Sequence, residues 1–194
     1  MNSSLIKRIL APIPLLIMLC VIFLFSSQDG SSSGGLSSGL GRAICEIFFA
    51  IFKKGATSDE ITAAAEAFEP FLRKGAHITE YFVLNFTVFL PVTVYCTTER
   101  HILATESSAY ALAKLKKGTY HRTSDSILPF PLRLVVTCLL SVAFASFDEL
   151  HQYFVPGREG RVPDVGIDSI GIALSAILII IVYLMINRNR RKRI

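Results

Sequence analysis

Four apolar segments of this chain are each close to the length that crosses a lipid bilayer. They are residues 9–26, 75–96, 132–147 and 165–186, of which the third is slightly short. A helix needs about 20 mostly apolar residues to span about 30 Å of hydrocarbon. Inside hydrocarbon, every backbone N–H and C=O must find a partner within the protein, which leaves helices and closed barrels as the spanning structures. The segments predict an all-α membrane protein with four transmembrane helices.

The composition supports this class. Of the 194 residues, 52% are hydrophobic and 18% are charged, and the mean hydropathy is +0.51, too apolar for an ordinary soluble domain. The net charge of +5 could suggest nucleic acid, but the basic residues flank the apolar segments, so we expect no nucleic-acid partner. The four cysteines show no CxxC or Cys/His spacing, so neither a disulfide framework nor a thiolate zinc site is indicated.

The first apolar segment has a second interpretation. Residues 1–8 followed by an apolar run resemble a signal peptide. The run is long for that role, and Phe25-Ser26-Ser27-Gln28 is a poor cleavage site. We therefore expect residues 9–26 to remain as a membrane helix, with Pro12 and Pro14 tolerated in its first turn.

The distribution of positive charge predicts the orientation. On one side of the expected membrane lie 13 of the 20 lysines and arginines, and the side richer in these residues is normally cytoplasmic. Both termini of the multi-pass protein are therefore expected in the cytoplasm. Residues 97–131 would form a cytoplasmic loop with a weak helix at 109–115, and residues 187–194 a basic cytoplasmic tail.

The first extracytoplasmic loop is predicted to carry an extra pair of helices. Residues 30–41 are rich in Gly and Ser and are expected to form a flexible linker. Residues 43–52 are apolar but too short to span, which is typical of an interfacial helix. A second loop helix is expected from Ser58, a plausible N-cap followed by acidic residues in the first turn.

Three polar clusters are expected at the outer ends of the spans. The first cluster begins at Arg73, the second begins directly after residue 147, and the third lies at the start of the fourth span. Charged groups near hydrocarbon are costly unless they are paired or used, and Gly166 and Gly171 would allow close helix approach. The residues expected to form the polar site are His77, Glu80, Asp148, Glu149, His151, Asp164 and Asp168, with Arg73, Lys74, Tyr81, Gln152 and Arg158 as ligand-binding residues.

Three functions remain open from these residues alone. The site could bind a phosphorylated or otherwise anionic headgroup through its basic residues. It could be an acid–base or metal-dependent hydrolase or transferase, since its histidines and carboxylates would suffice for zinc or manganese. No standard motif fixes the metal or any cofactor, because His77-x-x-Glu80 lacks the second histidine of HExxH. The third interpretation is a structural polar network without a ligand.

Several of these motifs also resemble those of a known family. The chain resembles the VanZ-like family in three places. They are Phe25-Ser26-Ser27-Gln28, the segment Arg73 to Tyr81, and Asp148-Glu149-Leu150-His151-Gln152 with Pro156-Gly157-Arg158, Asp164 and Asp168. Asp168-Ser169 departs from that pattern, in which an Asn-containing turn is expected. Members are small multispanning bacterial proteins, and the founding member is linked to low-level teicoplanin resistance. The resemblance implies an envelope role, with membrane lipids and a cell-wall precursor or lipoglycopeptide as expected partners, but it supplies no mechanism.

Overall fold

Helices account for almost all of the residues that the structure describes. The computed structural model describes residues 3–28, 30–53, 55–98, 125–126, 128–158 and 160–191. The all-α class expected from the sequence is confirmed, with one pair of two-residue strands added within these ranges. In chain order the elements are α1 (Ser3–Leu10), α2 (Ile13–Ser26), α3 (Gly30–Phe52), α4 (Ser58–Tyr95), β1 (Thr97–Thr98), β2 (Asp125–Ser126), α6 (Phe130–Tyr153) and α7 (Val162–Arg191).

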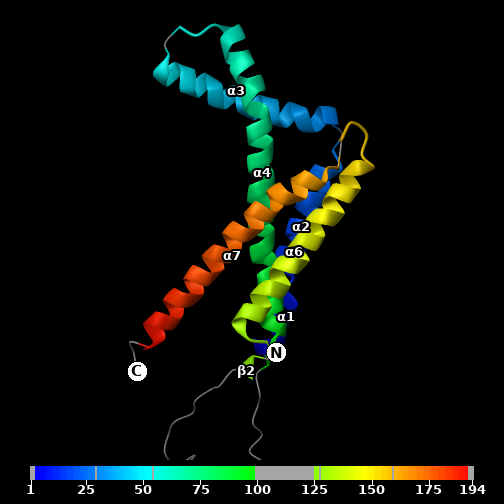
Figure 1. Cartoon of the computed structure of the whole chain (residues 1–194), viewed down its shortest axis with the longest axis vertical. Helices are drawn as coiled ribbons and strands as arrows, with labels where there is room; N and C mark the ends of the chain where they lie inside the picture. The colour runs from blue at the N-terminus through cyan, green and yellow to red at the C-terminus, as the bar shows by residue number, and fades with distance from the viewer. Residues whose placement is uncertain are drawn as a thin grey trace, which may run out of the picture.

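Four helical stretches are long and apolar enough to cross a membrane, as predicted. They are Leu5–Ser26, Ser58–Tyr95, Phe130–Tyr153 and Val162–Asn189. Figure 1 shows the chain passing along α2 to α3, back along α4, forward along α6 and back along α7. The start of α1 and the end of α7 therefore lie at the same end of the bundle, opposite α3.

The first span is broken near its start. The helical hydrogen bonds of α1 end where the Ala11 N–H donates to the Lys7 oxygen, and α2 begins at Ile13. Pro12 and Pro14 have no N–H to donate to the preceding turn, so they interrupt the ladder. They are tolerated at the start of α2, where the first N–H groups have no helical partner in any case.

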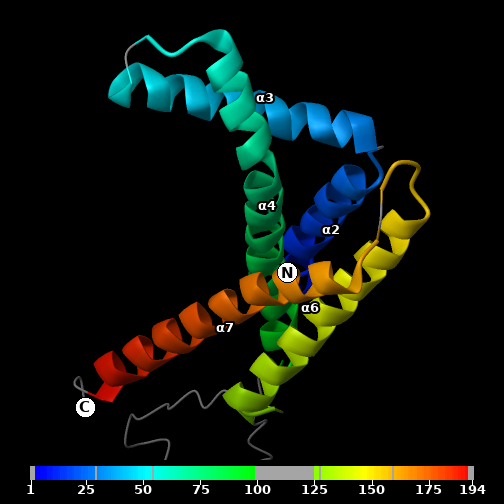
Figure 2. The ribbon, with the colours of Figure 1, turned by 45° about the horizontal axis from the view of Figure 1, so that its top comes forward.

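The prediction of a flexible linker at residues 30–41 is wrong, because these residues form the first half of α3. Figure 2 shows α3 lying across α4. A Cβ added at Gly41 would lie 3.4 Å from the Ala65 oxygen and 3.3 Å from Leu72 Cδ1, so the missing side chain permits close packing. Helix propensity is a weak tendency that such packing overrides. Ile47 and Ile51 of the same helix are exposed, which fits the predicted interfacial position.

The second loop helix and the second span form one helix of 38 residues, α4, rather than two. Thr57, not Ser58, is its N-cap: the Thr57 hydroxyl accepts from the Glu60 N–H, and the Glu60 carboxylate accepts from the Thr57 N–H. This capping box satisfies two donors that would otherwise be unpaired. Pro70 lies inside the helix.

The last two spans are longer than predicted. Helix α6 has 24 residues and includes the polar residues 148–152 in its last turns, and α7 extends through Arg191 into the predicted basic tail. At the opposite end from α3, Thr97 pairs with Ser126 and Thr98 with Asp125. The weak helix expected at 109–115 lies outside the described residues.

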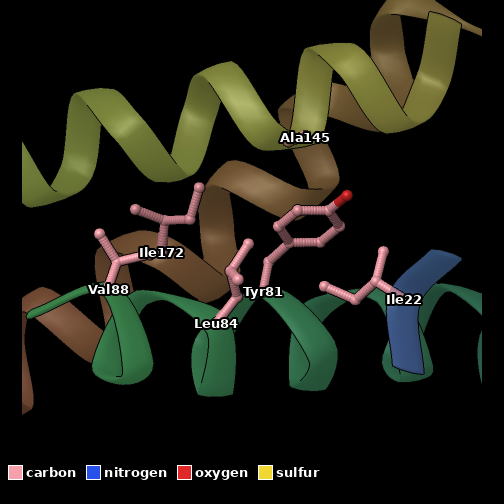
Figure 3. Close-up of a cluster of buried hydrophobic side chains, with 6 residues drawn as sticks. All are labelled: Ile22, Tyr81, Leu84, Val88, Ala145 and Ile172. Carbon is pink, nitrogen blue, oxygen red and sulfur yellow. The ribbon is translucent and has the colours of Figure 1, made fainter. Parts of the chain in front are cut away.

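The apolar core lies where α2, α4, α6 and α7 meet. Figure 3 shows Ile22, Tyr81, Leu84, Val88, Ala145 and Ile172 gathered between these helices. Many large apolar side chains are exposed on the outside of the bundle instead, among them Leu139, Phe147 and Leu184. An apolar exterior suits a protein whose solvent is lipid, so packing between helices and polar contacts must hold the bundle together.

A buried polar layer that the sequence pattern did not predict links three of the spans. The Asn85 amide of α4 donates to Ser175 Oγ of α7 at 3.1 Å, and Ser141 Oγ of α6 donates to Asn85 Oδ1 at 2.9 Å. All three side chains are fully buried. Asn85 thus joins α6 to α7 through one side chain.

Replacing Asn85 by alanine is expected to destabilise the bundle by about 1–2 kcal/mol, because two serine hydroxyls would lose an interhelical partner. Thr87→Ala is the matched control, since the Thr87 hydroxyl bonds to Leu84 of its own helix. Unfolding titrated with sodium dodecyl sulfate measures both variants. Equal stability losses in the two would contradict the interhelical role.

Candidate functional site

A pocket of about 560 Å³ lies at the end of the bundle nearest α3. Its walls come from α4, the last turns of α6, the connecting segment and the first turns of α7. The lining residues are Pro70, Arg73, Lys74, His77, Gln152, Gly157, Arg158, Arg161, Pro163, Asp164 and Ile167.

The connection between α6 and α7 begins with a tight turn at Pro156-Gly157-Arg158. The Arg158 N–H donates to the Val155 oxygen at 3.1 Å. Gly157 has a φ of 73°, which glycine adopts at the third position of such a turn without steric cost. The turn holds Arg158 against α2, where Nη1 donates to the Ser26 oxygen at 3.4 Å.

Positive charge dominates the pocket wall. Four lining side chains are lysine or arginine, whereas Asp164 is the single carboxylate among the lining residues that the structure describes. Burial and the neighbouring guanidinium of Arg73 lower the pKa of Arg158, with nearby carboxylates partly opposing them. The crowding of like charges favours an anion as the occupant.

Next to the pocket, three side chains from three spans converge. His77 of α4 lies with Nδ1 3.2 Å from Asp168 Oδ1 of α7, and Glu149 of α6 completes the group. Ligand-type atoms of the three residues all lie within 4.8 Å of one another. Asp168 is 0% exposed and Glu149 6%, whereas His77 also lines the pocket. Such a set could hold a divalent metal or support acid–base chemistry.

Several polar atoms of this cluster are buried without a hydrogen bond to any described residue. They are His77 Nδ1, Glu149 Oε1 and both carboxylate oxygens of Asp168. The His77–Asp168 contact is therefore close enough for an ion pair without the geometry of a hydrogen bond. The other Glu149 oxygen, Oε2, accepts from the Arg161 N–H at 2.9 Å. Apart from the His77–Asp168 ion pair, these buried atoms have no partner among the described residues, and buried polar groups without partners are costly.

Asp148 belongs to a separate network that joins α6 to α2. Its Oδ1 accepts from the Ser26 hydroxyl, and its Oδ2 accepts from the Gln152 amide at 2.8 Å. The Gln152 amide also lies 3.4 Å from Ser26 Oγ. Asp148 is thus hydrogen-bonded on both oxygens, unlike Asp168.

His151 lies apart from His77. Its ring stacks on Phe23 of α2 at 4.9 Å between centroids, and Nε2 lies 3.1 Å from Ser27 Oγ. The two histidines expected to share one site therefore contact different residues, and His151 is not part of the cluster that contains His77.

The remaining predicted residues surround the cluster. Glu80 is half-buried and interacts electrostatically with His77 and Arg158. Tyr81 is fully buried, and its hydroxyl points toward α6 without a hydrogen bond to the described residues (Figure 3). Asp164 lines the pocket and is not part of the cluster.

Two contributions to the site were not predicted as such. Ser26 anchors both Asp148 and Arg158, and its place at the end of the first span was the signal that could have identified it. Gly160 allows the connecting segment to approach α6, since a Cβ there would lie 2.1 Å from the Glu149 backbone oxygen. Nothing in the local sequence around Gly160 indicates this contact.

Comparison with known proteins identifies the family. The family model described as VanZ/LLP1 matches residues 12–183, which is most of the chain. No curated protein and no solved structure matches the chain. The matched range includes the basic pocket and the buried cluster. It also includes the whole second and third spans, and the first and fourth spans except for the start of the first and the end of the fourth. The chain is a membrane protein with four candidate spans, and it belongs to the VanZ/LLP1 family.

Proposed function

We propose that this protein acts at the bacterial cell envelope, where its pocket holds the anionic headgroup of an envelope lipid or cell-wall precursor. Binding would lower susceptibility to glycopeptide and lipoglycopeptide antibiotics such as teicoplanin. With both termini in the cytoplasm, the pocket would face outward, toward the compartment in which these drugs meet their targets. Membership of the VanZ/LLP1 family supports an envelope role.

The gathering of four cationic side chains in one pocket carries this proposal. Arg73 and Lys74 come from α4, while Arg158 and Arg161 come from the segment that precedes α7. Like charges repel, so a bound phosphate or carboxylate would stabilise the arrangement. Guanidinium groups bind such anions with two parallel hydrogen bonds, and lysine supplies a mobile point charge.

The Arg73→Ala, Lys74→Ala double variant tests the pocket. Each charge-assisted hydrogen bond contributes about 1.5–3 kcal/mol, so we expect affinity for an anionic headgroup to fall on the order of 100-fold or more. Native mass spectrometry with phosphatidylglycerol, compared with phosphatidylcholine, measures the loss. Susceptibility to teicoplanin in a bacterium expressing the variant should match that of cells lacking the protein.

Arg42→Ala, Lys53→Ala is the matched control. Both residues are exposed at the same end of the protein, on α3 and just after it, outside the pocket, and their ion pairs with Glu46 and Glu60 are superficial. Exposed pairs contribute little to stability. If control and pocket variants bind phosphatidylglycerol equally well, the headgroup proposal fails.

A hydrolase or transferase acting on the same lipids is the second candidate function. The position of His77, between the pocket and two buried carboxylates, favours it, because a His–carboxylate pair can act as a general base. Turnover of a phosphorylated lipid that disappears in His77→Ala and persists in His151→Ala would favour catalysis over binding alone.

A further inference from the structure

We propose that His77, Glu149 and Asp168 bind a divalent transition-metal ion, with zinc and manganese as the ions that fit the donors. The three side chains converge, and buried oxygens of Glu149 and Asp168 lack a hydrogen bond from the described residues. Both observations favour such an ion whichever lipid enters the pocket. Only the further step, in which the ion contacts a phosphate oxygen in the pocket, rests on the proposed function.

The separations suit metal ligation. In a tetrahedral zinc site, ligand atoms about 2.0–2.2 Å from the ion lie about 3.3–3.6 Å from one another. The most widely separated atoms of the cluster, which lie within 4.8 Å of each other, would therefore move closer by up to about 1.5 Å when the ion binds. The separation of 3.2 Å between His77 Nδ1 and Asp168 Oδ1 is already that of two adjacent ligands. One imidazole with two carboxylates matches the nitrogen and oxygen preferences of zinc and manganese.

Charge distinguishes a metal ion from a simple ion pair. A protonated His77 would neutralise one of the two buried carboxylates. The other would then depend on the Arg161 N–H and the charge of Arg158, which is weak compensation in a buried site. A divalent cation neutralises both carboxylates, and His77 then serves as a neutral ligand. It would also satisfy the orphaned atoms of all three side chains, which no described residue hydrogen-bonds.

The surroundings orient the ligands. The Arg161 N–H holds Glu149 Oε2, which leaves Oε1 as the free oxygen of that carboxylate. Outer-shell bonds of this kind fix ligand orientation in metal sites. Three protein ligands leave at least one coordination position for water or substrate, and His77 connects the cluster to the basic pocket. A metal ion in the cluster, next to the four lysine and arginine side chains of the pocket, would form a site suited to phosphate oxygens.

The test is metal binding by the full-length protein in detergent, with any polyhistidine tag removed and metal stripped by chelation. Titration with Co²⁺ followed by absorbance, and with Zn²⁺ followed by elemental mass spectrometry, should give about one bound ion per chain in the wild type. Loss of an outer-shell partner lowers metal affinity about 10–100-fold, so losing a ligand in His77→Ala or Asp168→Asn should lower it at least as much.

His151→Ala is the matched control and should bind metal like the wild type, because His151 contacts Phe23 and Ser27 instead of the cluster. Circular dichroism checks that each variant is folded. If His77→Ala loses its structure, the nearly isosteric Asp168→Asn still tests the loss of a ligand. A folded wild type that binds none of these ions, or equal binding by wild type and His77→Ala, overturns the metal site. Neither result depends on phosphatidylglycerol binding, so failure of this inference is distinguishable from failure of the proposed function.

Discussion

Replacing Gly171 by alanine is expected to force α7 away from α4 and lower the thermal midpoint by on the order of 10 °C, since overpacking costs about 1–3 kcal/mol or more. The added Cβ would lie 2.1 Å from the Ile78 oxygen and 2.9 Å from the Phe82 nitrogen. These are backbone atoms of α4, so no side chain can rotate to make room. Thermal unfolding in detergent, followed by circular dichroism, measures the effect.

Gly166→Ala on the same helix should have the opposite sign. A Cβ at Gly166 meets nothing within 4 Å, so alanine should gain up to about 1 kcal/mol of helix propensity over glycine. The sequence suggested both glycines as points of close helix approach, and the structure assigns that role to Gly171. If Gly171→Ala is as stable as Gly166→Ala, the close crossing of α4 and α7 is wrong.

The crossing at Gly171 also bears on the buried cluster. Asp168 lies about one turn before Gly171 on α7, and Ile78 directly follows His77 on α4. Separating the two helices at this point should widen the contact of 3.2 Å between His77 and Asp168. Gly171→Ala should therefore weaken metal binding as well as stability, whereas Gly166→Ala should weaken neither.

Replacing Gly160 by alanine is expected to lift the connecting segment from the end of α6 without unfolding the spans. Its Cβ would lie 2.1 Å from the backbone oxygen of Glu149 and 3.0 Å from the backbone nitrogen of Tyr153. The hydrogen bond from the Arg161 N–H to Glu149 should then break. Hydrogen bonds to charged groups contribute about 1.5–3 kcal/mol, so the Arg161 amide should exchange about 10–100-fold faster in hydrogen–deuterium exchange.

Gly75→Ala provides the comparison for Gly160. Gly75 lies on α4 at the same end of the bundle, and a Cβ there meets nothing within 4 Å. Exchange of the Arg161 amide should be unchanged in this variant. Unchanged exchange in Gly160→Ala too would mean that the connecting segment does not depend on the missing side chain.

The sequence by itself determined the architecture. Four apolar runs of membrane length left few alternatives to four spanning helices, because hydrocarbon offers no partner for an unpaired backbone group. The turn at Pro156-Gly157-Arg158 was equally local, since a proline followed by a glycine sets the backbone angles without help from the rest of the chain.

Only the tertiary structure decided which polar residues meet. The sequence grouped His77, Glu80 and His151 in one expected polar site, but it could not give the rotation of one helix against another. That rotation brings Glu149 and Asp168 to His77 and turns His151 toward α2. It follows from contacts between segments distant in sequence, such as Gly171 against Ile78.

The same cause explains the errors in the expected elements. A Gly- and Ser-rich segment is a linker by local propensity, yet residues 30–41 are helical and lead into the part of α3 that packs on α4 at Gly41. Asn85, Ser141 and Ser175 looked like isolated polar residues in apolar runs, and become a hydrogen-bonded layer when three helices meet. Local chemistry fixes which segments are helical spans, whereas the site depends on close packing between them, which no short stretch of sequence encodes.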